Sequence, residues 1–261
     1  MGNTQVSIEA SHGRQPYESA GEVMSWPRTL WMYLSPGILV MILYLFGGRW
    51  LQHHHQPADL ALAAGFALFA LPVELGRALR AAHRATGRWT LTGGVDFRAA
   101  TSRPRFLGRA LLLTVVAFGL LLLTLPLTSA LEAGPFHFLP NFLSSDYNWT
   151  KVPQARGWLL AVGGILLLIN GLVMPWVEEV YYRGYLLSRT PGRRSVAILV
   201  GAALFAVEHL WQPQNWPLIA GLAIVLGLAA YRWRTIWVGY VVHAFANSFG
   251  IIVLILPLVR R

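Results

Sequence analysis

Cysteine is absent from this chain of 261 residues, and Lys151 is its only lysine. Without a thiol, the chain can form no disulfide, cysteine nucleophile, cysteine metal site or palmitoyl anchor. The net charge of +10 therefore comes almost wholly from arginine, a bias that favours a bacterial source. We interpret this positive excess as topology signalling and contact with anionic lipid, and we expect no nucleic-acid partner.

Charged residues of any kind are also scarce. They make up 12% of the chain, whereas hydrophobic residues make up 55%. Soluble domains carry about 25% charged residues. No segment between the apolar runs is long enough to hold a core of its own. The composition predicts an all-α, polytopic membrane helical bundle, with a cytoplasmic tail at residues 1–28 and one transmembrane domain at residues 29–261.

The apolar runs set the number of helices, because a membrane-spanning helix needs about 20 apolar residues. We predict seven spans, at residues 30–47, 58–76, 109–131, 157–188, 194–211, 216–231 and 235–258. The fifth and sixth runs are short, and an eighth segment could lie in the membrane interface around residues 73–90. The expected bundle therefore has seven or eight helices.

Arginine placement predicts the orientation of these spans, since cytoplasmic loops are enriched in basic residues. With a cytoplasmic N-terminus, 16 of the 21 basic residues fall in cytoplasmic segments. We therefore expect an integral protein of the bacterial cytoplasmic membrane, with its N-terminus inside and its C-terminus outside.

Ionisable residues within the apolar runs are the strongest functional signal. A charged residue at the centre of a membrane helix costs about 2.5–3.5 kcal/mol, so such residues usually mark a functional site. Three short motifs of this kind lie on three different spans. They are Glu178-Glu179-x-x-x-Arg183, Phe205-x-x-x-His209 and His243-x-x-x-Asn247.

Helical spacing divides the first motif into two parts. Residues four apart share one face of a helix, so Glu179 and Arg183 can pair within their own helix. Glu178 is rotated by about 100° from Glu179 and is left to face another group. The other two motifs likewise place their two polar or aromatic residues on one face.

The depths of the motifs predict that they meet. At 1.5 Å per residue, Glu179, His209, His243 and Asn247 lie about 14–22 Å from the cytoplasmic ends of their helices. We therefore predict one buried polar site, open towards the cytoplasm.

A site of this composition could hydrolyse a peptide bond. A carboxylate beside a histidine can take a proton from water, and a second histidine and an asparagine amide can donate hydrogen bonds to an oxyanion. We predict an intramembrane endopeptidase that acts on a membrane-associated protein or peptide within the lipid bilayer. One alternative is a non-catalytic membrane chaperone or immunity protein. A less favoured one is a proton-coupled transporter, because the chain lacks paired broken helices in matching halves.

The three motifs, in this order, resemble the CPBP family of intramembrane proteases. This family, also called Abi, includes type II CAAX prenyl endopeptidases and bacteriocin-processing enzymes. The stretch at residues 182–187, Tyr-Arg-Gly-Tyr-Leu-Leu, is similar to the family as well. The resemblance covers about residues 170–250 and implies a protease core at about residues 157–255.

The resemblance implies a role for each catalytic candidate. Glu178 would activate a water molecule with help from His209. His243 and Asn247 would form the oxyanion hole. A non-catalytic member of the family would be expected to lose such residues, and this chain retains all of them.

The supporting residues implied by the resemblance are Glu179 and Arg183, which would hold the geometry of the site. Members of the family have been assigned both metal-dependent and metal-free mechanisms. We favour a reaction without a cofactor. The alternative is a zinc ion held by His209, His243 and a glutamate, with water in the fourth position.

Other ionisable residues have structural interpretations. We expect Glu74 and Arg77, at the end of the second span, to mark the membrane interface. Glu208 is rotated by about 100° from His209 and is expected to pair with a polar group or water. The run His53-His54-His55 is expected to lie in a solvated loop.

Overall fold

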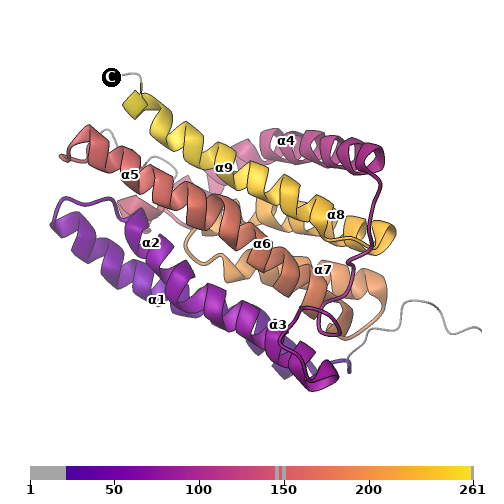
Figure 1. Cartoon of the computed structure of the whole chain (residues 1–261). Coiled ribbons are helices and arrows are strands. Elements are labelled where there is room, and N and C mark those ends of the chain that lie inside the picture. The colour runs from indigo at the N-terminus through magenta and orange to yellow at the C-terminus, as the bar shows by residue number, and fades with distance from the viewer. Residues whose placement is uncertain (1–21, 145–146, 149–150, 260–261) are drawn as a thin grey trace, which may run out of the picture.

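The computed structural model describes residues 22–144, 147–148 and 151–259. Most of the predicted tail at residues 1–28 thus lies outside the described residues, as does the very C-terminus. Within them the chain forms helices and connections, with one isolated bridge between Arg98 and Thr235 and no strand. The predicted all-α helical bundle is confirmed (Figure 1).

Apart from the short η2, the helices of the described residues follow one another in seven runs, four of which are single α-helices. The elements are α1 (Trp26–His53), α2 (Asp59–Gly65), η1 (Phe66–Ala70), α3 (Leu71–Thr86), α4 (Arg103–Ala133), η2 (Asn141–Leu143), α5 (Arg156–Leu166), η4 (Leu167–Val173), α6 (Met174–Glu178), η5 (Glu179–Leu186), η6 (Leu187–Arg189), α7 (Arg194–Glu208), η7 (Pro213–Asn215), α8 (Trp216–Trp233) and α9 (Trp237–Val259).

The helical runs agree with the predicted spans at most positions. Six runs of described residues are long and apolar enough to cross a membrane. The fifth predicted span ends early, because the backbone leaves the helical conformation at His209 and α7 has only 15 residues. The segment expected in the interface is no separate element, since α2, η1 and α3 form one continuous run at Asp59–Thr86.

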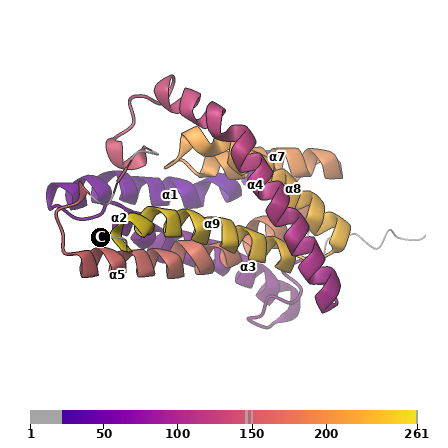
Figure 2. The same cartoon turned by 90° about the horizontal axis from the view of Figure 1, so that it is seen from above.

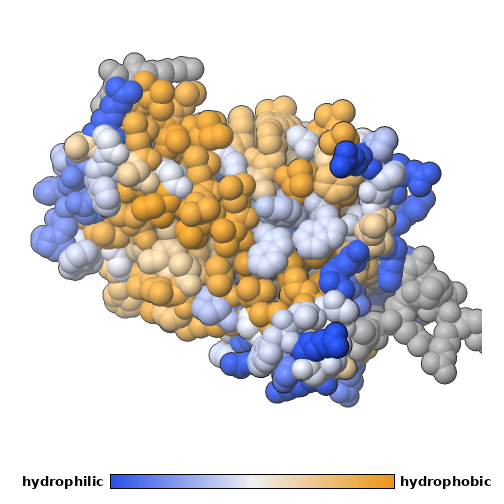
Figure 3. All heavy atoms as spheres, in the orientation of Figure 1, coloured by the Kyte–Doolittle hydropathy of each residue, from blue (hydrophilic) through white to orange (hydrophobic). Residues whose placement is uncertain are grey.

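An apolar band separates two polar ends of the bundle (Figure 3). The arginine-rich end carries the connections at residues 87–102, 190–193 and 234–236. The arginine-poor end carries the connections at residues 54–58, 134–155 and 209–215. Viewed from above, α4 crosses obliquely over α8 and α9 (Figure 2). These long apolar helices make the chain an integral membrane protein.

A close contact between α1 and α7 positions the end of α7. A methyl group at Gly37 would lie 2.1 Å from the backbone oxygen of Glu208, which is too short for any real contact. Only glycine therefore lets the two helices approach this closely. The contact places Glu208 and His209 against α1, at the depth where the motif residues of other helices lie.

Candidate active site

The Glu178-Glu179 pair lies where an α-helix changes into a π-type helix. Glu178 ends α6, and η5 continues the run with bonds of the i to i+5 type. Such segments occur often at functional sites. Every residue from 177 to 187 is buried, including both carboxylates and Arg183. Three ionisable side chains are thus held inside the protein within two turns.

Glu179 is the anchor of this cluster. Its Oε1 lies 3.2 Å from Nη1 of Arg183, as the spacing predicted, and 3.2 Å from Nδ1 of His243. The Arg183 guanidinium also lies 4.1 Å from the centre of the Phe205 ring, over its face. A methyl group at Gly239 would lie 2.7 Å from the other Glu179 oxygen, so this position of α9 has room only for a glycine. Glu179 therefore joins η5 to α9.

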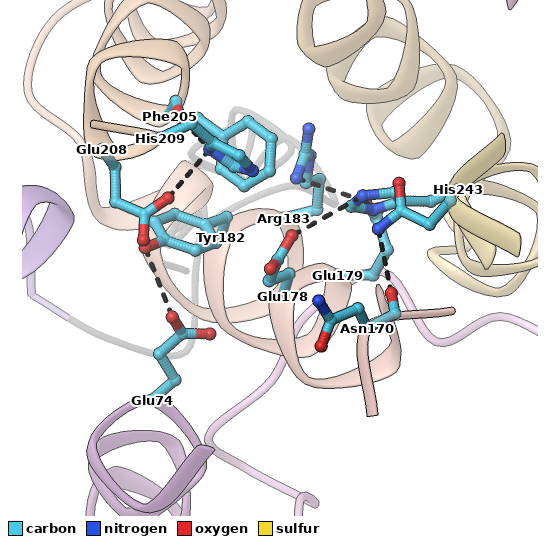
Figure 4. Close-up of polar contacts among 11 residues, drawn as sticks. Glu74, Asn170, Glu178, Glu179, Tyr182, Arg183, Phe205, Glu208, His209 and His243 are labelled. Carbon is cyan, nitrogen blue, oxygen red and sulfur yellow. Dashed lines mark hydrogen bonds and ion pairs between the residues drawn. The ribbon is translucent and has the colours of Figure 1, made fainter. Parts of the chain in front are cut away.

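Glu178 faces the second ring nitrogen of the same histidine. Its Oε2 lies 3.6 Å from Nε2 of His243, beyond ordinary hydrogen-bond length, and has no hydrogen-bond partner among the described residues. In Figure 4 the Glu178 carboxylate points towards His243, and His209 lies on its other side. The carboxylate predicted to be free is thus placed between both predicted histidines.

His209 follows the last residue of α7, and both its Nδ1 atom and its ring faces contact neighbouring residues. Its Nδ1 lies 2.8 Å from the Phe205 carbonyl oxygen and 2.9 Å from Oε2 of Glu208. Its ring packs between Phe205 and Trp211, with centroids 4.7 and 4.8 Å away. Because both partners of Nδ1 are acceptors, the ring carries a proton there, and Nε2 is left for the site.

Asn247 contacts a residue that the motifs do not include. Its side-chain nitrogen donates a hydrogen bond of 3.0 Å to the backbone oxygen of Asn170. Asn170 lies in η4, another π-type segment, where its carbonyl can be reached by a side chain of α9. An asparagine within an apolar run is a signal that could have been noticed in the sequence. The irregular helix that exposes its carbonyl has no such signal.

The position of Glu74 differs from the prediction. Rather than lying in the interface, its side chain is buried, with 1% exposed, and Tyr182 donates a hydrogen bond of 3.4 Å to it. Figure 4 shows Glu74 and Glu208 on the same side of the cluster. The prediction is wrong because the second helical run continues to Thr86, well past the expected end at residue 76. Glu74 is therefore far from the end of its helix.

Arg77 is half-buried and makes hydrogen bonds within the bundle. Its guanidinium donates hydrogen bonds to the Met32 carbonyl, the Ser35 hydroxyl and the Tyr181 hydroxyl, at 3.3, 2.9 and 3.0 Å. These bonds join α3 to α1 and η5. Glu208 has the polar partner that was expected of it, and that partner is its neighbour His209.

One cavity of about 580 Å³ connects the predicted residues. Glu178, His209, His243 and Asn247 all line it, and so does Arg183. Most of the remaining lining is apolar and comes from α4, α8 and α9. The structure thus brings all four catalytic candidates to one surface.

The polar lining of the cavity outside the motifs is gathered towards the arginine-poor end. Asp59, Ser144, Gln212, Gln214 and Asn215 belong to that end, whereas Thr114 lies within α4 and Asn170 within η4. This polar lining lies away from the arginine-rich end, towards which we predicted the site to open. Which end is cytoplasmic stays a prediction. A depth of about 22 Å below one face of a core about 30 Å thick is only about 8 Å below the other. Equal depths showed that the motifs meet, but not from which face they are reached.

The zinc alternative involves His209, His243 and a glutamate, and it stays a prediction. Among the described residues, no group of three or more histidines or carboxylates is placed to hold a metal ion. The Nδ1 atom of His209 faces Phe205 and Glu208, and Nδ1 of His243 faces Glu179. A metal ion would therefore have to bind both rings through Nε2, with the Nδ1 partners orienting the two rings.

A comparison with known families now bears on this site. Residues 158–249 match the model of a family described as type II CAAX prenyl endopeptidase Rce1-like. This segment is similar to that family. The matched segment begins in α5 and ends in α9, so it contains all three motifs. The resemblance to CAAX-type proteases is thereby confirmed. No curated protein and no solved structure matches the chain.

Proposed function

We propose that this protein is an intramembrane endopeptidase that hydrolyses a peptide bond of a membrane-associated protein or peptide. The observation that carries the proposal is the placement of Glu178. Its carboxylate lines the cavity beside His243 and lacks a hydrogen-bond partner among the described residues. A buried carboxylate oxygen without a hydrogen bond is costly, and its cost is explained if it binds water and substrate. The similarity to the Rce1-like family supports this conclusion, since that family is one of proteases.

Glu178 acts in this proposal as the general base. It accepts a proton from a water molecule while the water oxygen bonds to the substrate carbonyl carbon, and the carbonyl oxygen becomes an oxyanion. When this intermediate collapses, the carbon–nitrogen bond breaks and the proton passes from Glu178 to the leaving amine. All atoms of the products come from water and peptide, and no step of this proposal uses a cofactor.

His243 and Asn247 stabilise the oxyanion in the same proposal. Nδ1 of His243 contacts Glu179 at 3.2 Å, whereas Nε2 lies 3.6 Å from Glu178, beyond ordinary hydrogen-bond length, and is the nitrogen that faces the substrate oxygen in this proposal. Asn247 uses one N–H for the Asn170 carbonyl, which fixes the amide and leaves a second N–H for the substrate. Preorganised donors of this kind stabilise charge as it develops. Glu179 and Arg183 hold His243 in place.

Glu208 is a positioning residue that acts through His209. Its Oε2 lies 2.9 Å from Nδ1 as an ion-pair partner, while the Phe205 carbonyl accepts the hydrogen bond of Nδ1. Together they aim Nε2 at the cavity, where it helps Glu178 to orient the water. The motif Phe205-x-x-x-His209 contains the carbonyl and the ring but does not identify this carboxylate. These two acceptors keep His209 in one tautomer throughout the reaction.

A Glu178→Gln variant tests the proposal. It keeps the shape of the side chain and removes the base, so we expect its substrate to remain uncut. The membrane proteomes of a deletion strain and of strains that express the wild-type or variant protein would be compared for uncut species. Glu74→Gln is the matched control, because it changes a buried carboxyl that does not line the cavity. Processing that persists in Glu178→Gln would leave the non-catalytic chaperone as the better explanation.

A further inference from the structure

The arginines and the cavity point to opposite ends of the bundle. Eight arginines lie at residues 77–109. Three more lie at residues 189–194 and two at residues 232–234. Basic residues in short connections are retained on the cytoplasmic side. The arginine-rich end is therefore expected to be cytoplasmic. The polar residues that line the cavity outside the motifs lie mainly at the arginine-poor end.

A packed layer closes the site towards the arginine-rich end. It belongs to a hydrophobic cluster that reaches from Met24 to Ile236 and includes Tyr33, Tyr181 and Tyr182. The three tyrosines are at most 2% exposed. The hydroxyl groups of Tyr181 and Tyr182 donate to backbone oxygens of α1 at 2.8 and 3.3 Å, so the layer is held by hydrogen bonds as well as by packing. A polypeptide cannot pass through it without unpacking this core.

The arginine-poor end offers polar groups to an entering chain. Asp59, Ser144 and Gln212 line the cavity there and are partly exposed. Gln214 is buried and donates through its side-chain nitrogen to the Leu143 carbonyl at 2.9 Å. Its Oε1 has no hydrogen-bond partner among the described residues. This oxygen is an acceptor for an N–H group of a bound peptide.

We propose that the substrate reaches the site from the arginine-poor, non-cytoplasmic end, an inference that rests on the proposed function. At 1.5 Å per residue, the 15 residues of α7 place His209 about 22 Å from Arg194. In a hydrocarbon core of about 30 Å, the scissile bond then lies about 8 Å below the non-cytoplasmic surface. The substrate class is a membrane-anchored protein or peptide whose cleavage point lies near the non-cytoplasmic end of its anchor.

The absence of cysteine allows a direct test by single-cysteine labelling in a bacterial expression host. Ser144→Cys places a nearly isosteric thiol in the cavity wall, and Asn141→Cys places one on the exposed surface of the same end. Ala100→Cys marks the arginine-rich end, where Ala100 is exposed. Intact cells and permeabilised cells would be treated with a sulfonated maleimide that does not cross membranes.

We expect Asn141→Cys and Ser144→Cys to be labelled in intact cells, and Ala100→Cys only after permeabilisation. Labelling of Ala100→Cys in intact cells would overturn the proposal, because the bundle would then have the opposite orientation. Failure of Ser144→Cys to react where Asn141→Cys does would also overturn it, because the cavity would then be closed from this end. Labelling needs no turnover, so it can be repeated with Glu178→Ala and is independent of the outcome for catalysis.

Discussion

Replacement of Glu208 gives the sharpest test of how the site works. Glu208 is buried, and its Oε2 lies 2.9 Å from Nδ1 of His209. A hydrogen bond to a charged group contributes about 1.5–3 kcal/mol, whereas a neutral one contributes about 0.5–1.5 kcal/mol. Glu208→Gln retains an acceptor of the same size without the charge. Glu208→Leu removes both. Since about 1.4 kcal/mol corresponds to a factor of ten in rate, we expect kcat to fall about tenfold in the first variant and up to about 100-fold in the second.

The assay for these variants uses purified protein and a quenched fluorescent peptide that spans a cleavage site found by the proteome comparison. KM is expected to change little, because Glu208 lies behind His209 and is not among the residues that line the cavity. A second measurement needs no substrate. In protein with ¹⁵N-labelled histidine, the Nδ1 proton of His209 should be strongly deshielded by the carboxylate, and this signal should move in Glu208→Gln.

Glu74→Gln controls for the loss of a buried carboxyl as such. Glu74 is as deeply buried as Glu208 but receives its hydrogen bond from Tyr182 rather than from His209. We expect its kcat and its His209 signal to match the wild type. The reasoning is refuted if a folded Glu208→Leu protein keeps the wild-type kcat, or if Glu74→Gln loses as much activity as Glu208→Gln.

Three further predictions concern the support of the site. Arg183→Met removes the arginine partner of the buried Glu179 and leaves it only His243. The free energy of unfolding, measured in detergent, should fall by about 3–5 kcal/mol; a loss below about 1 kcal/mol would contradict the buried pair. Gly239→Ala forces a methyl group against Glu179 and should lower kcat at least tenfold, while Gly250→Ala, on the same helix with open space around it, should remain active. Purified protein is expected to contain no stoichiometric zinc by elemental analysis and to keep its activity in a chelator, whereas activity restored only by added zinc would support the zinc alternative.

Local features explain which parts of the site could be predicted. The pairing of Glu179 with Arg183 depends only on a spacing of four residues, and the structure shows it. The burial of Glu74 depends on where its helix ends, and no break marks that point at residue 76. The contact of His243 with both glutamates depends on how closely α9 approaches η5 at Gly239, which a single helix cannot reveal.

The sequence by itself determined the membrane class, the helical runs and the three motifs, because hydrophobic length and helical period are properties of each segment alone. Only the tertiary structure decided that Glu208 holds His209, that Asn170 holds Asn247, and that the cavity extends to the arginine-poor end. These features arise where α7 stops against Gly37 of α1 and where π-type segments turn side chains and carbonyls towards other helices. Contacts of this kind join residues that are far apart in the chain, and their geometry is set by packing between helices.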